Sequence, residues 1–259
     1  MVSDQSKIRV RLYVDADFSV GESIPLPAEE IRYYEKVRRK RGPIVLFNRR
    51  GSEASGELHE NHFRINKVSV NPLPLYDLVV AVAFPESAII PAIIRGSSEL
   101  GVTKLVFFHA ARTQATRSRH LNRKKENRPE VLPRWTKIAI ESARQCGRGV
   151  PLEISIETDW NPARMKDREH CWFFDEATPA ESGESESSDV YEPRFSKVSR
   201  GFAVIGCEGG WTDQERQRAR DHKFEFVHFK TPILKVETAV TCASFFCVER
   251  MNSVVRHAL

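Results

Sequence analysis

The chain has few cysteines, and none of them belongs to a CxxC pair. Five cysteines in 259 residues leave one over and make no disulfide framework, which is typical of a protein from a reducing compartment. No segment approaches the roughly 18 consecutive apolar residues that a membrane span requires. The N-terminal segment also lacks the continuous apolar stretch of a signal peptide. We therefore expect a cytoplasmic protein that makes no contact with a membrane.

Phosphate-binding and metal-binding motifs are also missing. A glycine-containing segment at 205–212 is followed by no GK[ST], and the chain contains no GxGxxG, so neither a P-loop nor a dinucleotide fingerprint is present. His59 and His62 have a spacing compatible with a metal site, but no further histidine or cysteine nearby completes a set. We therefore predict no metal site and disfavour nucleoside triphosphate and dinucleotide chemistry.

Basic residues are concentrated in two parts of the chain, although the net charge is only +5. Residues 32–50 contain eight basic residues and one acidic residue, a net charge of +7, and residues 112–148 contain eleven and three, a net charge of +8. Residues 157–192 show the reverse, with three basic and eleven acidic residues, and include a Ser/Glu-rich run at 181–189 that predicts a surface loop. Each basic block alone fits a solvated surface. Two together are typical of a nucleic-acid-binding protein.

The first part of the chain has the pattern of a small β-rich domain. Between Val10 and about Val70, short alternating segments separated by turn residues predict strands. Gly51 and Gly56 are expected to bracket a hairpin-like connection. Residues 27–40 have apolar side chains at helical spacing and predict one helix.

The second part alternates buried strands with helices, and Pro72 and Pro74 mark the boundary, giving predicted domains of residues 1–74 and 75–259. Continuous apolar runs predict strands that are covered on both faces. The predicted strands are 78–84, 104–110, 172–175, 202–206 and 225–229, and the predicted helices are 87–100, 131–146, 212–222 and 239–257. Thr212 and Glu215 have the spacing of a capping box. The alternation predicts an α/β fold with a parallel sheet, whose ligand site lies beyond the carboxyl ends of the strands.

Two segments that follow predicted strands carry the most specific pattern. Residues 205–212, IGCEGGWT, place three glycines where the backbone turns tightly or approaches a ligand. Residues 233–239, ILKVETA, would by themselves indicate only a helix start with Glu237 favoured by the helix dipole. As a pair, they resemble the IGPEGG(F/L)(S/T) and (I/V)LRTET(A/T) motifs of the ribosomal RNA small subunit methyltransferase E family. That family comprises uridine-N3 methyltransferases of the SPOUT superfamily.

The resemblance extends over nearly the whole chain. SELGV at 98–102 is similar to the family's (T/S)ELGV, and residues 134–151 are similar to its RW..IA.EA.EQ.GR..VP stretch. Residues 11–14 and 36–47 resemble its opening segments. The implied fold is a SPOUT-type trefoil-knotted parallel sheet domain, preceded by a small PUA-like β-barrel for RNA. The implied function is S-adenosylmethionine-dependent methylation of N3 of a uridine in 16S rRNA of the small ribosomal subunit, by a homodimer.

The resemblance also implies site residues, which we name by their numbers in this sequence. The expected cofactor-binding residues are Phe174, Ile205, Gly206, Glu208, Gly209, Gly210, Phe229, Ile233, Leu234, Thr238 and Ala239. The expected RNA-binding residues are Arg11, Lys36, Arg38, Arg39, Arg95, Arg112, Arg117, Arg119 and Arg148. Lys235, which replaces an arginine of the motif, is expected to stabilise the anion that forms when uridine N3 loses its proton. Glu237 is expected to act as a base or to orient the substrate, and a helix cap or salt bridge explains it nearly as well.

Three departures from the family pattern leave an alternative open. Residues 83–90 replace a basic KGDKM-like segment, Cys207 replaces a proline, and Lys235-Val236 replaces Arg-Thr. The alternative is a catalytically degenerate SPOUT-fold protein that binds RNA or assists ribosome assembly. Because both alternatives predict salt-dependent RNA binding, cofactor binding is the property that separates them.

Overall fold

The computed structural model describes residues 10–37, 42–71, 74–113, 131–160, 168–176 and 200–256. They form two compact units, the first made of residues 1–74 with 140–151 and the second of residues 75–139 with 152–259. Within the described ranges, no helix combines the length and the hydrophobicity that a membrane span needs. The acidic run 181–189 and the predicted RNA-binding residues Arg38, Arg39, Arg117 and Arg119 lie outside the described residues.

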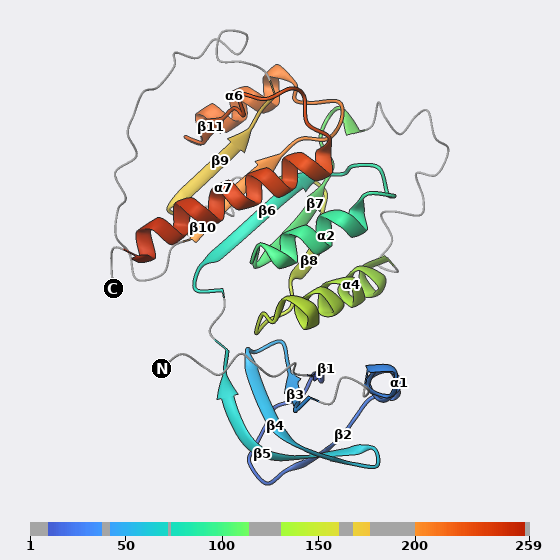
Figure 1. Ribbon diagram of the computed structural model, residues 1–259. Coiled ribbons are helices and arrows are strands. Elements are labelled where there is room, and N and C mark those ends of the chain that lie inside the picture. Colours follow the sequence, from blue (N-terminus) through green and yellow to red (C-terminus); the bar gives the residue numbers. More distant parts are fainter. Residues whose placement is uncertain are drawn as a thin grey trace. The chain divides into compact units, whose positions relative to one another are not determined.

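The first unit contains a five-stranded sheet that forms half of a barrel (Figure 1). Its elements are β1 (Val10–Tyr13), β2 (Ser23–Pro25), α1 (Ala28–Val37), β3 (Ile44–Phe47), β4 (Ser52–His59) and β5 (His62–Val70). The strand order is β1-β3-β4-β5-β2, with β1 and β3 parallel and the other pairs antiparallel. Leu12, Leu46 and Phe63, all fully buried, belong to the hydrophobic cluster of this unit. The predicted β-rich character and the helix near 27–40 are confirmed.

The expectation that Gly51 and Gly56 bracket a hairpin connection is wrong. Gly56 lies inside β4, where the register with β5 shifts between Ser55 and Gly56, and the hairpin turns instead at Glu60 and Asn61. A Cβ at position 56 would collide with the carbonyl oxygen of Arg64 on the partner strand. Glycine is therefore required for close approach of two backbones at a bulge and does not mark a turn.

The second unit is built on a six-stranded sheet whose strand pairs are all parallel. Its strands are β6 (Asp77–Ala83), β7 (Lys104–Phe108), β8 (Glu153–Glu157), β9 (His170–Phe174), β10 (Arg200–Ile205) and β11 (Glu225–Val227). The predicted parallel α/β sheet is confirmed, but β8 was not predicted. Its sequence, EISIE, is short and alternating and contains no continuous apolar run.

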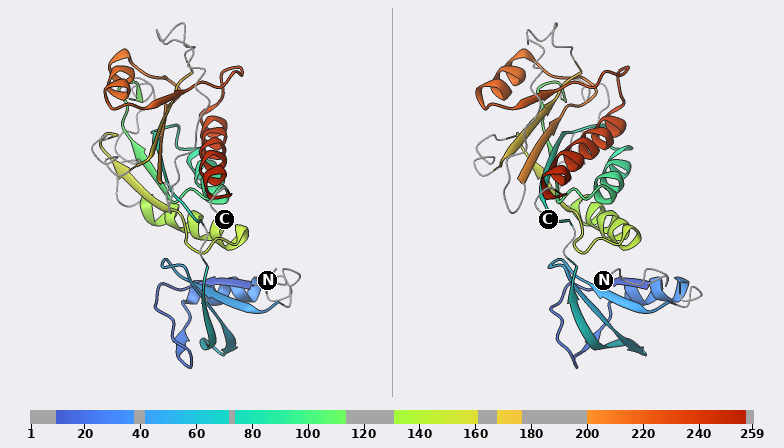
Figure 2. Two further views of the ribbon diagram at one scale, coloured as in Figure 1. Left: turned by 90° about the vertical axis from the view of Figure 1, so that its left-hand side faces the viewer. Right: turned by 60° about the vertical axis from the view of Figure 1, so that its left-hand side comes forward.

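Helices cover both faces of this sheet. They are α2 (Ile90–Glu99), α4 (Val131–Cys146), α6 (Asp213–Asp221) and α7 (Val236–Arg256). Side chains of β6 alternate between the two hydrophobic clusters, because Leu78, Val80 and Val82 belong to one and Val79 and Ala81 to the other. Helices α2 and α7 pack side by side on the first face, and α6 lies on the opposite face (Figure 2). Trp135 and Trp172 are both buried in the first of these clusters.

The strand order creates a point where the direction of the chain across the sheet reverses. The order is β11-β9-β10-β6-β7-β8, so the chain passes from β6 through β7 to β8 on one side, and the later strands lie on the other. In open parallel sheets, ligands bind beyond the carboxyl ends of the strands near such a reversal. We therefore expect a ligand-binding site among the residues that follow β6, β9, β10 and β11.

Candidate functional site

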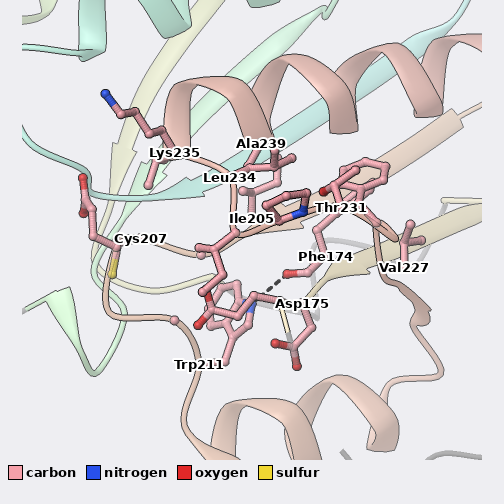
Figure 3. A pocket seen from close by; sticks show the side chains of 18 residues that line it. Phe174, Asp175, Ile205, Cys207, Trp211, Val227, Thr231, Leu234, Lys235 and Ala239 are labelled. Carbon is pink, nitrogen blue, oxygen red and sulfur yellow. Dashed lines mark hydrogen bonds between the residues drawn. The ribbon is translucent and has the colours of Figure 1, made fainter. Parts of the chain in front are cut away.

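A cavity of about 240 Å³ lies at the carboxyl ends of β9, β10 and β11 and is completed by the start of α7 (Figure 3). Its lining comes from three segments, residues 174–176, 205–211 and 227–239. The parallel strands bring these segments together, because their carboxyl ends meet at one edge of the sheet. The sequence rule for parallel sheets thus places the cavity correctly.

Trp211 forms a buried wall of the cavity. Its side chain is 1% exposed, its ring centroid lies 4.6 Å from that of Phe173, and its Nε1–H donates a hydrogen bond to the carbonyl oxygen of Phe174 at 2.8 Å (Figure 3). A Cβ at Gly206 would lie 3.2 Å from the Trp211 ring. The first glycine of the loop therefore permits the indole to pack against the backbone that leaves β10.

The other two glycines shape a tight turn. Gly210 has φ +63°, and its N–H donates to the carbonyl oxygen of Cys207 at 2.9 Å. A Cβ at this position would collide with the carboxylate of Glu176. A Cβ at Gly209 would lie 2.9 Å from the Cβ of Arg112, whose Nη1 donates to the carbonyl oxygen of Gly209 at 2.9 Å. Close approach from both sides, together with the positive φ of Gly210, explains why this turn is glycine-rich.

The predicted capping box of α6 is confirmed, and it also fixes a neighbouring loop. Thr212 Oγ1 accepts a hydrogen bond from Glu215 N at 3.3 Å, and the Glu215 carboxylate accepts one from Thr212 N at 2.9 Å. The same carboxylate accepts a hydrogen bond from Ala111 N at 3.0 Å. One glutamate therefore ties the loop after β7 to the helix that follows the glycine turn.

An ion pair with a buried carboxylate lies at the cavity wall. Asp175 follows β9, and its completely buried carboxylate accepts hydrogen bonds from Arg216 Nε at 2.6 Å and from Arg216 Nη2 at 3.1 Å. These hydrogen bonds raise the pKa of the Arg216 guanidinium above its ordinary value, against the opposing effect of its partial burial. The charge of Asp175 is thus compensated within the protein.

The wall of the cavity opposite Trp211 is mostly apolar, and the ammonium group of Lys235 lies at its edge. The rings of Phe174 and Phe229 lie 5.5 Å apart, and Leu234 and Ala239 continue the apolar surface at the start of α7. Lys235 is exposed, and in Figure 3 its side chain extends away from Phe174. No acidic side chain of the described part of the chain lies within ion-pair distance of its amine. This lysine is therefore available to an anionic ligand at the edge of the cavity.

Most residues predicted for the cofactor and for catalysis are brought together by the structure. Of thirteen, ten line the cavity: Phe174, Ile205, Gly206, Glu208, Gly210, Phe229, Ile233, Leu234, Lys235 and Ala239. The other three do not line the cavity: Gly209 is part of the glycine turn, Thr238 is exposed, and Glu237 is half-buried in the first turn of α7. The carbonyl oxygen of Glu237 accepts a hydrogen bond from Thr241 Oγ1 at 2.8 Å. These positions give Glu237 the character of a helix-start residue more than of a cavity residue.

Eight further lining residues are not among the site residues named individually from the sequence. They are Asp175, Glu176, Cys207, Trp211, Val227, Thr231, Pro232 and Val236. Asp175 ends the predicted strand 172–175 and Glu176 follows it, so the rule that ligands bind at carboxyl ends of strands was sufficient to select them. Trp211 lies within the recognised motif, but its burial beneath Gly206 depends on packing that no local pattern contains.

The predicted RNA-binding residues separate into buried and exposed groups. Arg11 and Arg148 are only 8% and 6% exposed. Arg11 Nη1 pairs with Glu53 at 2.6 Å, and Arg11 Nη2 donates to the carbonyl oxygen of Arg148 at 2.8 Å. A phosphate could reach the Arg11 guanidinium only by displacing those partners, and Arg148 Nε donates to the carbonyl oxygen of Val150. The structure therefore favours a structural role for both arginines, contrary to expectation. Lys36 and Arg95 are exposed, on α1 and α2.

Comparison with known proteins places the chain in a family. The family model described as an RNA methyltransferase domain matches residues 71–246. The chain belongs to this family. The fold and cavity described above are therefore those of an RNA methyltransferase domain.

Curated relatives narrow the comparison further. The chain is 29% identical over 170 residues to ribosomal RNA small subunit methyltransferase E of Bacillus subtilis, covering 65% of this chain and 62% of the relative. It is 26% identical over 248 residues to the protein of the same name from Synechocystis, covering 90% of this chain and 75% of the relative. The chain thus spans less than two thirds of the length of the Bacillus subtilis protein that it matches.

Solved structures share the fold. A putative methyltransferase from Legionella pneumophila, in complex with the bound cofactor SAM, superposes with a TM-score of 0.71 at 22% identity, covering 95% of this chain and 98% of the other. Ribosomal RNA small subunit methyltransferase E from Neisseria gonorrhoeae, bound to S-adenosyl methionine, gives the same TM-score, identity and coverage. At this identity the similarity establishes the fold, an α/β architecture with a parallel sheet.

Proposed function

We propose that this protein is an S-adenosylmethionine-dependent methyltransferase that acts on N3 of a uridine in 16S rRNA of the small ribosomal subunit. The observation that carries the proposal is the cavity at the carboxyl ends of β9, β10 and β11, in which ten residues expected from the methyltransferase resemblance converge. Relatives named ribosomal RNA small subunit methyltransferase E support the choice of substrate. The proposal includes a cytoplasmic homodimer and a PUA-like first domain of residues 1–74. It also includes a trefoil knot formed by the segments that line the cavity.

The lining fits the chemical groups of such a cofactor. Apolar surface from Phe174, Ile205 and Leu234 suits an adenine ring, and the carboxylate of Glu176 at the glycine turn can accept hydrogen bonds from hydroxyl or ammonium groups. When bound, the cofactor supplies a methyl group on a positively charged sulfur. Cavity residues hold this cofactor and exclude water, so that positioning supplies much of the rate.

Lys235 is the residue we assign to the chemistry of uridine. Removing the N3 proton leaves negative charge on the uracil carbonyl oxygens, and an ammonium group beside them lowers the free energy of that anion. Lys235 is exposed at the edge of the cavity, where a base can approach it. Glu237 lies in the first turn of α7 and does not line the cavity. We therefore assign it to the start of this helix and to orientation of the 233–236 segment.

The intact cavity favours the methyltransferase over the non-catalytic RNA-binding alternative. A protein that had lost turnover would not need an open cavity bounded by Gly206, Gly210 and Lys235. Replacement of the basic KGDKM-like segment removes positive charge near the site, while Arg95 and Arg112 remain exposed. These two arginines are the described basic residues of the second unit that we assign to RNA.

Titration calorimetry with S-adenosylmethionine tests the proposal first. We expect binding with a stoichiometry of about one per chain, followed by transfer of a radiolabelled methyl group to small ribosomal subunits and recovery of 3-methyluridine from the digested 16S rRNA. A folded protein that binds no cofactor, with or without RNA present, would contradict the assignment and leave the RNA-binding alternative.

A lysine substitution tests the chemical step. Lys235→Ala should lower the rate of methyl transfer about 100-fold or more, while the cofactor Kd changes less than about threefold. Lys230→Ala is the matched control, because Lys230 is an exposed lysine of the same connecting segment that does not line the cavity. Equal losses of cofactor affinity and rate in Lys235→Ala would remove this lysine from the chemistry.

A further inference from the structure

We propose that the ion pair between Asp175 and Arg216 is a positioning device that sets the affinity of the cavity for the cofactor. This inference rests on the proposed function for the identity of the ligand. Neither side chain belongs to the motifs that identified the family. Asp175 follows β9, and Arg216 lies on α6, the helix that begins directly after the glycine turn. The pair therefore joins one lining segment, residues 174–176, to the helix that directly follows a second, residues 205–211.

The geometry of the pair fixes both partners. Two nitrogens of Arg216 donate to the two carboxylate oxygens of Asp175, at 2.6 and 3.1 Å, and the carboxylate is completely buried. Two parallel hydrogen bonds between planar groups restrict orientation as well as distance. Loss of Arg216 would remove two charge-assisted hydrogen bonds from a fully buried carboxylate, so the end of β9 would have to rearrange to solvate it.

One backbone hydrogen bond and two side-chain contacts connect Asp175 and its neighbours to the other two lining segments. Asp175 N donates to the carbonyl oxygen of Val227 at 3.2 Å, which joins the end of β9 to the end of β11. One residue earlier, the Phe174 carbonyl oxygen accepts the Trp211 indole N–H. One residue later, the Glu176 carboxylate lies against Gly210. A displacement of Asp175 would therefore move contacts to all three cavity segments.

The same helix provides a matched control. Arg218 Nη1 donates to Asp159 Oδ2 at 2.7 Å, and its guanidinium lies 4.9 Å from the centroid of the Trp160 ring. This second pair is more exposed, at 37% and 48% of the side-chain area, and neither partner lines the cavity. It shares the residue types and the helix with the first pair, so it reports the general effect of losing an arginine–aspartate pair on α6.

Cofactor affinity of matched variants tests the proposal. We expect Arg216→Ala to raise the Kd for S-adenosylmethionine about tenfold or more, and Arg216→Lys to fall between it and the wild type, because lysine keeps the charge but loses the paired hydrogen bonds. Arg218→Ala should stay within about twofold of the wild type. In methyl transfer, Arg216→Ala should raise the cofactor KM and recover most of its rate at saturating cofactor.

A measurement that needs no ligand keeps the proposal independent of the proposed function. Hydrogen exchange of the amides at 174–176 and 205–211 should be about tenfold faster in Arg216→Ala than in Arg218→Ala, because the first variant alone releases these segments. Ile94→Val, a small core change on α2 remote from the cavity, controls for general loss of stability.

Two results would overturn the positioning role. One is unchanged exchange of both segments in Arg216→Ala. The other is equal loss of affinity or equal exchange in Arg218→Ala or Ile94→Val, which would make the effect one of general stability. If the wild type binds no cofactor while exchange responds only to Arg216→Ala, the proposed function fails and the positioning of these segments by the pair stands.

Discussion

Glycine positions in the second unit show how single residues make the cavity possible. Gly206, Gly209 and Gly210 each lie where an added Cβ would approach another group closely, but only Gly210 also has a positive φ among the three. Two different requirements, backbone conformation and space, therefore coincide at Gly210. Gly147 has a similar φ of +77°, but no heavy atom lies within 4 Å of an added Cβ. This position therefore requires glycine for its backbone conformation alone.

Alanine substitutions at these two glycines separate strain from collision. Gly147→Ala should lower the free energy of unfolding by about 1–2 kcal/mol, because an L-residue is strained at positive φ. Gly210→Ala should lower it by more and should also weaken S-adenosylmethionine binding about tenfold, because the methyl group displaces the Glu176 carboxylate from the turn. Urea unfolding and calorimetric titration of both variants measure this. Equal unfolding losses with unchanged cofactor affinity would show that the contact with Glu176 is unimportant.

Arginine shows that residue type alone does not decide a role. Arg11 and Arg95 were both expected to bind RNA, yet Arg11 is buried against Glu53 and Arg95 is exposed on α2. Arg112 is exposed but donates a hydrogen bond to the glycine turn. The sequence contains the charge of each arginine, whereas the partner of each guanidinium is a property of the folded chain.

At the scale of elements, α6 is specified by its own sequence. Its capping box satisfies backbone N–H groups that no earlier helical carbonyl can reach, so the start of the helix is encoded locally. The start of α7 is less clearly encoded: the helix begins at Val236, three residues before the predicted position at Ala239. The motif residues 236–238 therefore lie in the helix, although the apolar pattern alone assigned them to the preceding connection.

Substitution of the cap residue tests the local encoding of α6. Thr212→Ala should lower the free energy of unfolding by about 1 kcal/mol, because Glu215 N loses its acceptor. Thr212→Ser retains the hydroxyl and should remain close to the wild type. Thermal and urea unfolding of the two variants provide the measurement. A serine variant as unstable as the alanine variant would show that the methyl group of Thr212, and not its hydroxyl, stabilises this region.

At the scale of the whole molecule, a half-buried histidine outside the cavity lining makes stability depend on pH. His170 on β9 stacks on Trp172 with ring centroids 5.4 Å apart. Burial lowers the pKa of His170 below its ordinary value of 6.5, with Arg250 in the same direction and Glu169 and Glu225 opposed. Between the lowered pKa and 6.5 the unfolded chain binds more protons than the folded one. His170 therefore stabilises the fold above pH 6.5, and this contribution is lost as the pH falls through the lowered pKa.

Unfolding at two pH values measures that contribution. For the wild type, the free energy of unfolding should decrease between about pH 7.5 and about pH 5, and the decrease should be smaller in His170→Gln, which has no titrating ring. His62→Gln is the control, because His62 is exposed on β5. The same decrease in wild type and His170→Gln would exclude His170 as a source of the pH dependence.

The sequence by itself determined the class of fold and most of the cavity lining. Apolar runs buried on two faces specify a parallel sheet, and the family resemblance names ten cavity residues, because both kinds of information are contained in short local segments. Only the tertiary structure decided which groups face each other across large sequence distances. Asp175 and Arg216 are 41 residues apart, and Arg11 and Arg148 are 137 apart. No local pattern pairs such residues, because their contact depends on how the strands are ordered and how tightly the interior packs.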